Sequence, residues 1–211
     1  MATKRIYFVR HGETPHNKER IYQSDRVPLS EKGIAGAKAV ADRLSTLPLD
    51  IMIASTFVRA QETAQAIELA TGLSILTSPL IHEVLNARYI WGVGIESEEG
   101  KRYAQERREG FTTKEWHPDG AENYFMVSAR VEATIAMLAA QAHEHIVVVS
   151  HGNFIRFLTA RLLLQKQDDL ESNMAVYRSL DRMQNAGITE FTYTDGMWKL
   201  FTWNDHAHFA E

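Results

Sequence analysis

Three short apolar runs constrain the fold of this chain more than any other feature of its sequence. They occupy residues 6–9, 51–54 and 146–149, and they are rich in β-branched side chains. Apolar residues follow one another in these runs instead of alternating with polar ones, which is typical of strands buried on both faces. The pattern therefore predicts a parallel sheet at the centre of the fold.

Helical patterns fill the sequence between these runs. Ser30 precedes a stretch with apolar residues at helical spacing that Pro48 terminates, and residues 58–69, 121–142 and 154–164 continue in the same style. Strands that alternate with helices form right-handed β-α-β units. We therefore expect an α/β fold of three layers, α/β/α, around a mostly parallel sheet.

Two regions depart from this alternation. Residues 188–194 and 198–203 flank an Asp-Gly dipeptide, which is a strong hairpin signal, so an antiparallel edge is expected at the C-terminal end of the chain. Residues 84–120 are rich in glycine and irregular, and they predict a partly helical cap inserted over one sheet edge. Because no linker or repeat separates these parts, we expect a single domain over residues 1–211.

The predicted cap carries many charged residues. Arg102, Arg107 and Arg108 stand among several glutamates. Opposite charges a few residues apart on a helix form weak, exposed ion pairs, so these arginines are expected to lie on a solvated helix face.

The charge and cysteine content exclude several classes of protein. Lysine and arginine number 23 against 27 aspartates and glutamates, a net charge of −4, so the chain lacks the basic footprint of a nucleic-acid binder. The absence of cysteine excludes thiolate catalysis and cysteine-ligated metals, and it favours a reducing cytoplasm. No apolar run approaches the ~18 residues of a membrane span, so no membrane partner is expected.

The residues that directly follow the three predicted strands are polar and similar in kind. Arg10 and His11 follow the first strand, Arg59 comes soon after the second, and His151 follows the third. In an open parallel sheet, ligands bind outside the carboxyl ends of the strands. Two arginines and two histidines, remote in sequence, are therefore expected to meet at one edge of the sheet.

Such a collection suits a phosphoryl group. Arginine binds phosphate oxygens bidentately and keeps its charge at pH 7. Helix N-termini beside Gly12 and Gly152 would add backbone N–H donors. Of His11 and His151, one would attack as a neutral ring, and the other, protonated, would hold the phosphate.

The order of these motifs resembles the histidine phosphatase superfamily, in its phosphoglycerate mutase-like branch. The resemblance spans nearly the whole chain and includes five segments: Arg10-His11-Gly12-Glu13-Thr14 with Asn17, Gln23 with residues 28–33, residues 55–64 around Arg59, Ser150-His151-Gly152, and Asn204-Asp205 with His208.

The resemblance implies roles for individual residues. His11 would be the nucleophile that becomes a phosphohistidine. Substrate phosphate would be bound by a larger set: Arg10, Asn17, Gln23, Arg59, His151 and Gly152. The general acid would be Glu83, which lies in a Leu-x-Glu-like stretch. In another register, residues 85–89 match a Leu-Asn-Glu-Arg stretch of the mutases, with Ala87 in the place of the acid.

The resemblance implies a metal-independent, cofactor-free phosphatase acting on a small phosphate monoester. One alternative is a mutase that returns the phosphoryl group to a second hydroxyl. The other, motivated by Ala87, is a weakly active module that binds a phosphorylated ligand. Gln23 and the length of 211 residues favour the phosphatase. The physiological substrate and the oligomeric state are left open, with a homodimer as one option.

Overall fold

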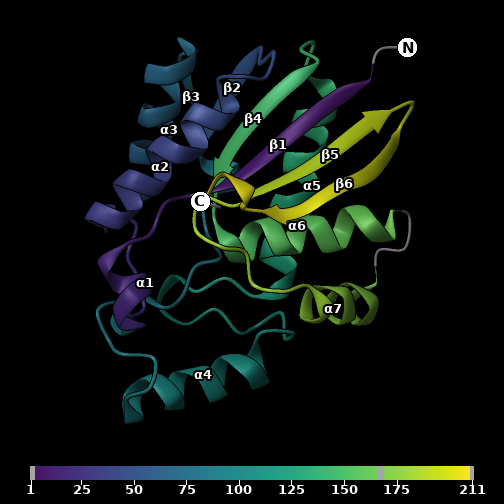
Figure 1. The fold of residues 1–211 in the computed structure, drawn as a ribbon. Helices are drawn as coiled ribbons and strands as arrows, with labels where there is room; N and C mark the ends of the chain where they lie inside the picture. Colours follow the sequence, from purple (N-terminus) through teal and green to yellow (C-terminus); the bar gives the residue numbers. More distant parts are fainter. Residues whose placement is uncertain (1–2, 166–168, 210–211) are drawn as a thin grey trace.

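A six-stranded mixed sheet forms the centre of the molecule. The computed structural model describes residues 3–165 and 169–209. The strands lie side by side in the order β3-β2-β4-β1-β5-β6 (Figure 1). Their bounds are β1 Lys4–Arg10, β2 Ile51–Ser55, β3 Ile75–Ser78, β4 His145–Ser150, β5 Ile188–Thr194 and β6 Met197–Asp205.

The three apolar runs are confirmed as the central strands. β1 and β2 both pair in parallel with β4, and β3 pairs in parallel with β2. In β1, Ile6 and Phe8 join the core on one face of the sheet while Tyr7 and Val9 join the core on the other. Both faces are buried, which explains why apolar residues succeed one another without alternation.

Helices cover both faces of the sheet, as the three-layer prediction requires. Helices α2 and α3 pack on one face, and α5 and α6 pack on the other (Figure 1). The predicted helix over residues 121–142 is shorter, because Asn123 caps its N-terminus by accepting from Met126 N–H. The helices are α1 Pro15–Glu19, α2 Glu31–Leu44, α3 Val58–Thr71, α4 Glu98–Gly110, α5 Tyr124–Ala140, α6 Gly152–Leu164 and α7 Leu170–Ser179.

The C-terminal hairpin is also confirmed. β5 pairs antiparallel with β1, and β6 pairs antiparallel with β5. Asp195 and Gly196 form the turn with φ angles of 52° and 82°, a left-handed conformation that a tight hairpin favours. Within the described part of the chain, no helix is both long and apolar enough to cross a membrane.

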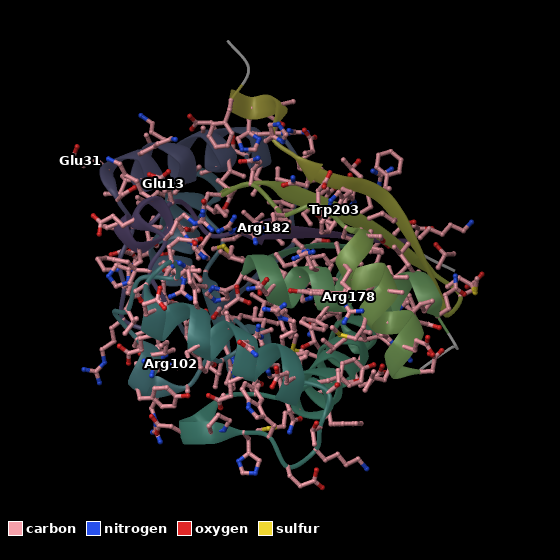
Figure 2. All side chains as sticks on the ribbon, turned by 90° about the horizontal axis from the view of Figure 1, so that it is seen from below. Glu13, Glu31, Arg102, Arg178, Arg182 and Trp203 are labelled. Carbon is pink, nitrogen blue, oxygen red and sulfur yellow. The ribbon has the colours of Figure 1, made fainter. Side chains whose placement is uncertain are left out.

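Residues 84–120 form the predicted cap, which lies beyond the carboxyl ends of the parallel strands (Figure 1). The cap contains α4 and has a small apolar cluster of its own around Tyr103, whose hydroxyl accepts from Ala87 N–H at 2.9 Å. Seen from the cap side, Arg102 lies on the cap and Arg182 lies nearer the middle of the molecule (Figure 2). The remaining short elements are 3₁₀ helices: Pro79–Ile81, Arg88–Ile90, Pro118–Gly120 and Ala207–Phe209.

Candidate active site

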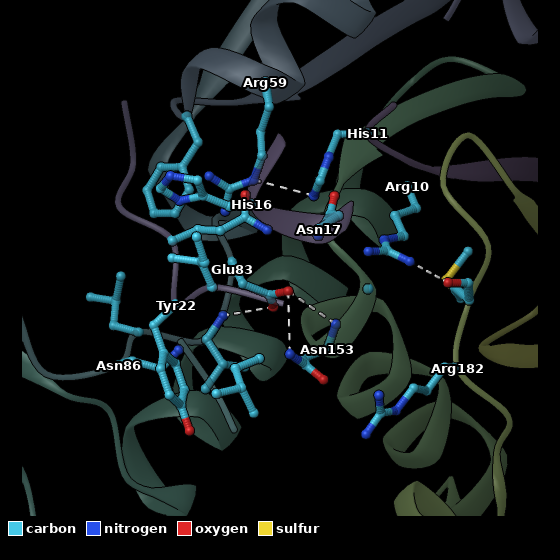
Figure 3. A pocket seen from close by; sticks show the side chains of 18 of the residues that line it. Arg10, His11, His16, Asn17, Tyr22, Arg59, Glu83, Asn86, Asn153 and Arg182 are labelled. Carbon is cyan, nitrogen blue, oxygen red and sulfur yellow. Dashed lines mark hydrogen bonds between the residues drawn. The ribbon is translucent and has the colours of Figure 1, made fainter. Parts of the chain in front are cut away.

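The carboxyl ends of β1, β2 and β4 open into a pocket of roughly 560 Å³ beneath the cap (Figure 3). The structure brings together the two arginines and two histidines that the strand ends predict. We call Arg10, His11, Arg59 and His151 the His/Arg centre. His151 is fully buried and does not line the cavity itself, but its ring lies 5.1 Å from that of His11.

The ring of His11 is held in one tautomer. Its Nδ1 lies 2.7 Å from the carbonyl oxygen of Gly12, which can only accept, so Nδ1 carries the proton. Nε2 keeps a lone pair, toward which the Nε–H of Arg59 points at 3.2 Å. Burial, then the charges of Arg59 and Arg10, lower the pKa of His11 well below its usual range. The ring is therefore neutral at pH 7, with Nε2 as a nucleophilic atom.

A hydrogen bond from Ser55 places His151 in the same tautomer as His11. Ser55 Oγ accepts from Phe57 N–H, so its hydroxyl proton is available for His151 Nε2, 2.8 Å away. The proton of the neutral ring then lies on Nδ1, which is buried without a partner among the described residues. Burial and Arg59 lower the pKa of His151 well below its usual range. Without a ligand the ring is therefore neutral, and it still offers an N–H donor.

The two arginines differ in how they are held. Arg59 donates from Nη1 to Ser24 O at 2.8 Å, and its guanidinium stacks over Phe57. Burial lowers the pKa of Arg59 to about 10, so it stays charged at pH 7. Arg10 donates to Met183 O, while its buried Nε has no partner in the described structure. Both cations are therefore held in place near His11, and each keeps N–H donors that can bind a ligand.

The glycines of the two motifs serve packing more than direct access to a ligand. A Cβ on Gly12 would collide with the carbonyl oxygen of Gly33 in α2. The N–H of Gly12 donates to Thr63 Oγ1 at 3.0 Å, so it is not the free donor that the sequence suggested. A Cβ on Gly152 would lie 3.2 Å from Arg10 Nε, so this glycine leaves room for the guanidinium.

Glu83 lines the pocket opposite His11 (Figure 3). Its carboxylate accepts from the N–H groups of Asn153 and Phe154, at 3.2 and 3.0 Å, in the first turn of α6. A carboxylate is favoured at a helix N-terminus, where unpaired N–H groups and the helix dipole meet it. Ala87, the alternative position for an acid, is buried in the cap cluster and does not line the cavity.

A buried ion pair fixes the segment that carries Glu83. Arg130 of α5 and Glu122 are less than one tenth exposed and lie 2.7 Å apart. Arg130 Nη1 donates to the carbonyl oxygens of Leu80 and His82, at 2.9 and 2.7 Å. Sequence analysis gave no sign of the contacts to Leu80 and His82, because these residues lie 50 and 48 positions from Arg130 in the chain.

The remaining predicted residues, Asn17 and Gln23, also line the pocket. Thr14 Oγ1 donates to Gln23 Oε1 at 2.9 Å. Asn185, which the sequence analysis missed, donates from Nδ2 to Asn17 Oδ1 and to the carbonyl oxygen of His11, both at 3.1 Å. Asn185 comes just before β5, and the start of an antiparallel strand lies at the same edge as the ends of parallel ones.

Four further arginines line the cavity and were not predicted to do so: Arg20, which is paired with Glu96 at 2.7 Å, and Arg107, Arg156 and Arg182. The expectation of a solvated face holds for Arg102 and Arg108, which are exposed, but it is wrong for Arg107. No group of three or more His, Asp or Glu side chains that could hold a metal ion occurs in residues 3–165 and 169–209.

A neutral histidine whose Nε2 lone pair faces Arg59, with Arg10 in the same pocket, is suited to phosphoryl transfer. Residues 6–206 match the sequence family described as the histidine phosphatase superfamily (branch 1). The chain belongs to this superfamily, whose members are phosphatases or mutases. The resemblance drawn from the motifs is thereby confirmed.

Some similar proteins are named as mutases and others as phosphatases or hydrolases. A probable phosphoglycerate mutase GpmB from Enterobacter sp. (strain 638) is 32% identical over 94% of this chain and 89% of its own length. The structure of a protein called mycobacterial hydrolase 1 covers 97% of this chain and 100% of its own, with 27% identity and a TM-score of 0.79. A mycobacterial glucosyl-3-phosphoglycerate phosphatase in complex with VO₃ has 27% identity and a TM-score of 0.77, with coverages of 96% and 100%.

Proposed function

We propose that this chain is a metal-independent phosphatase that hydrolyses a small phosphate monoester through a phosphohistidine on His11. The observation that carries the proposal is the fixed tautomer of His11, which leaves the lone pair on Nε2, beside the Nε–H of Arg59 in the pocket that Arg10 also lines. The arginines and the Nδ1–H of His151 would hold the phosphate oxygens, as bidentate and charge-assisted donors do.

The first step transfers the phosphoryl group to the enzyme. The Nε–H of Arg59 moves from the His11 lone pair to a phosphate oxygen, and Nε2 attacks phosphorus in line with the ester oxygen. The N–P bond forms as the P–O bond breaks. Glu83 enters this step protonated and gives its proton to the departing alkoxide, so that a neutral alcohol leaves, and the N–H groups of Asn153 and Phe154 hold the carboxylate that remains.

The second step returns the enzyme to its starting state. A water molecule attacks the phosphohistidine, and the Glu83 carboxylate takes the proton that the water loses. The P–N bond breaks, inorganic phosphate leaves, and His11 regains its lone pair. Glu83 lies on the opposite side of the pocket from His11, which suits a group that acts first as acid and then as base.

The proposal is tested by trapping the intermediate. The protein mixed with phosphorus-labelled p-nitrophenyl phosphate and quenched rapidly in base should carry label that is stable in base and lost in acid. Peptide mapping should locate the label on His11. Turnover without any such label would contradict the phosphohistidine.

A mutase is the second candidate, and the name of the 32%-identical relative favours it. A mutase must keep water from the phosphohistidine and return the phosphoryl group to a second hydroxyl. Incubation with 3-phosphoglycerate, with and without a bisphosphoglycerate primer, separates the two. A phosphatase releases inorganic phosphate in both cases, and a mutase interconverts phosphoglycerates when primed.

A further inference from the structure

The pocket is larger and more basic than a single phosphate group requires. Its volume is roughly 560 Å³, and Arg10 and Arg59 already provide two charges for one phosphate dianion. Besides Arg20, which is paired with Glu96, three more arginines line the pocket, although the chain as a whole carries a net charge of −4. We call this second set, Arg107, Arg156 and Arg182, the arginine cluster.

The cluster comes from three separate parts of the fold. Arg107 lies on α4 of the cap, Arg156 lies on α6, and Arg182 lies in the segment between α7 and β5. Arg182 extends toward the cavity on the side where Arg10 lies, near Asn153 (Figure 3). Three elements therefore direct cations into one part of the pocket.

No carboxylate of the described residues neutralises these cations by an ion pair. Arg156 donates from Nη2 to the carbonyl oxygens of Tyr177 and Leu180, both at 2.8 Å, and stacks over the ring of Tyr177. The Nε atoms of Arg107 and Arg156 are buried without hydrogen-bond partners. Arg107 and Arg156 are half-buried and Arg182 is exposed, and donors that are removed from water without a partner favour the binding of an anion.

The hydroxyl of Tyr177 connects this cluster to Glu83. It donates to Asn153 Oδ1 at 3.1 Å, and Asn153 Nδ2 donates to Glu83 Oε2 at 3.4 Å. The cluster therefore lies on the side of the pocket where Glu83 would meet the leaving group. A substrate whose phosphate contacts the His/Arg centre would extend its alcohol part toward the arginine cluster.

We propose that the arginine cluster binds a second anionic group, a carboxylate or a second phosphate, carried by the alcohol part of the substrate. This inference rests on the proposed function, because it takes the phosphate ester to sit at the His/Arg centre. The natural substrates would be phosphorylated acids or bisphosphates, and neutral sugar phosphates would be poor ligands. Arginine suits this role because its planar fork matches both carboxylate and phosphate.

The test measures binding of phosphonates, which cannot be hydrolysed, by isothermal titration calorimetry. Alkylphosphonates of two to four carbons are compared with phosphonocarboxylates and bisphosphonates of the same lengths. At the favourable length, the ligands with two anionic groups should bind about tenfold more tightly or better, as expected for one charge-assisted contact. A gain for only one series identifies the second group as carboxylate or phosphate, and either gain supports the proposal.

Variants of the cluster locate the effect. Arg182→Ala and Arg107→Ala should each reduce that affinity ratio about tenfold and leave the binding of the alkylphosphonate unchanged. Arg108→Ala is the matched control, because Arg108 is an exposed neighbour on α4 that does not line the pocket. Arg156 is left intact, because it holds the chain at Tyr177 and Leu180.

Two results would overturn the proposal: equal affinities for the two kinds of ligand in the unmodified protein, or a ratio that both variants leave unchanged. Hydrolysis of p-nitrophenyl phosphate, measured in parallel, reports on the proposed function separately. Absence of hydrolysis together with a cluster-dependent affinity ratio would reject the phosphatase and keep the second anion site.

Discussion

The His/Arg centre and the arginine cluster lie in one pocket and are built in different ways. The residues of the centre come from strand ends or the first helical turn after a strand, and His11, Arg59 and His151 are at most 2% exposed. The arginines of the cluster come from helices and a connecting segment, and Arg182 is exposed. The sheet fixes the chemistry in position, whereas recognition depends on side chains that can change without disturbing the sheet.

Among the variants of the two regions, removal of the nucleophile should cause the largest loss of activity. His11→Ala should abolish turnover of every phosphate ester, because the variant lacks the lone pair beside the Nε–H of Arg59. The fold, followed by circular dichroism, should be retained, since His11 belongs to neither apolar core cluster of the sheet. Turnover at the level of the unmodified protein would show that the nucleophile is elsewhere in the pocket.

Replacement of the acid should come next, and its effect depends on the leaving group. Glu83→Gln should slow hydrolysis of an alkyl phosphate by ~10²–10⁴-fold, because an alkoxide needs a proton to depart. p-Nitrophenolate departs without one, so p-nitrophenyl phosphate should be affected much less. Equal losses on both substrates, measured as kcat, would assign Glu83 to positioning and not to proton transfer.

Arg59→Ala should have a smaller effect, on ligand affinity, and it distinguishes the His/Arg centre from the arginine cluster. Vanadate and all phosphonates should bind about 10- to 100-fold more weakly, because the variant lacks a buried charge-assisted contact to the shared group. A cluster variant should instead affect only ligands with a second anion. Arg26→Ala is a control, as Arg26 is exposed and does not line the pocket. If Arg59→Ala weakened the binding only of ligands with a second anionic group, the two regions would not have separate roles.

The smallest expected effect is the change of the free energy of unfolding with pH. His11 and His151 have pKa values held well below the usual range in the folded protein, so the unfolded chain binds more protons below about pH 6.5. The contribution of these histidines to the free energy of unfolding should be greatest above that pH. It should decline as the pH falls, by up to about 1.4 kcal/mol per pH unit for each histidine. Urea unfolding between pH 5 and 8 measures this slope.

His151→Gln should flatten that slope, whereas replacement of the exposed His143 by Gln should leave it unchanged. A slope of the opposite sign, with stability rising as the pH falls, would mean that one of the buried histidines gains a proton on folding.

The parts of the site that follow strands were predictable, and the parts on helix faces were not. Arg10 and His151 directly follow apolar runs that signal buried strands, and the ends of parallel strands must share an edge. Arg156 stands inside a helical pattern and Arg182 in an irregular segment, where periodicity gives no direction toward a pocket. β3 was missed because it is a short edge strand with Leu76 half exposed, so its pattern is not that of a buried strand.

The position of Glu122 has a consequence for how the cap relates to the rest of the chain. Glu122 N–H donates to Leu85 O at 3.0 Å, and Leu85 N–H donates to Glu122 Oε2 at 2.9 Å. The cap therefore leaves the core and returns to it at neighbouring points, as a closed loop on a short stem. The entropy of closing a loop grows only slowly with its length, so the intervening segment can lengthen or shorten outside residues 92–95, whose backbone pairs with residues 20–22. A chimera that keeps Leu85, Glu122 and Arg130 but carries another cap should keep Glu83 in place and accept a different alcohol.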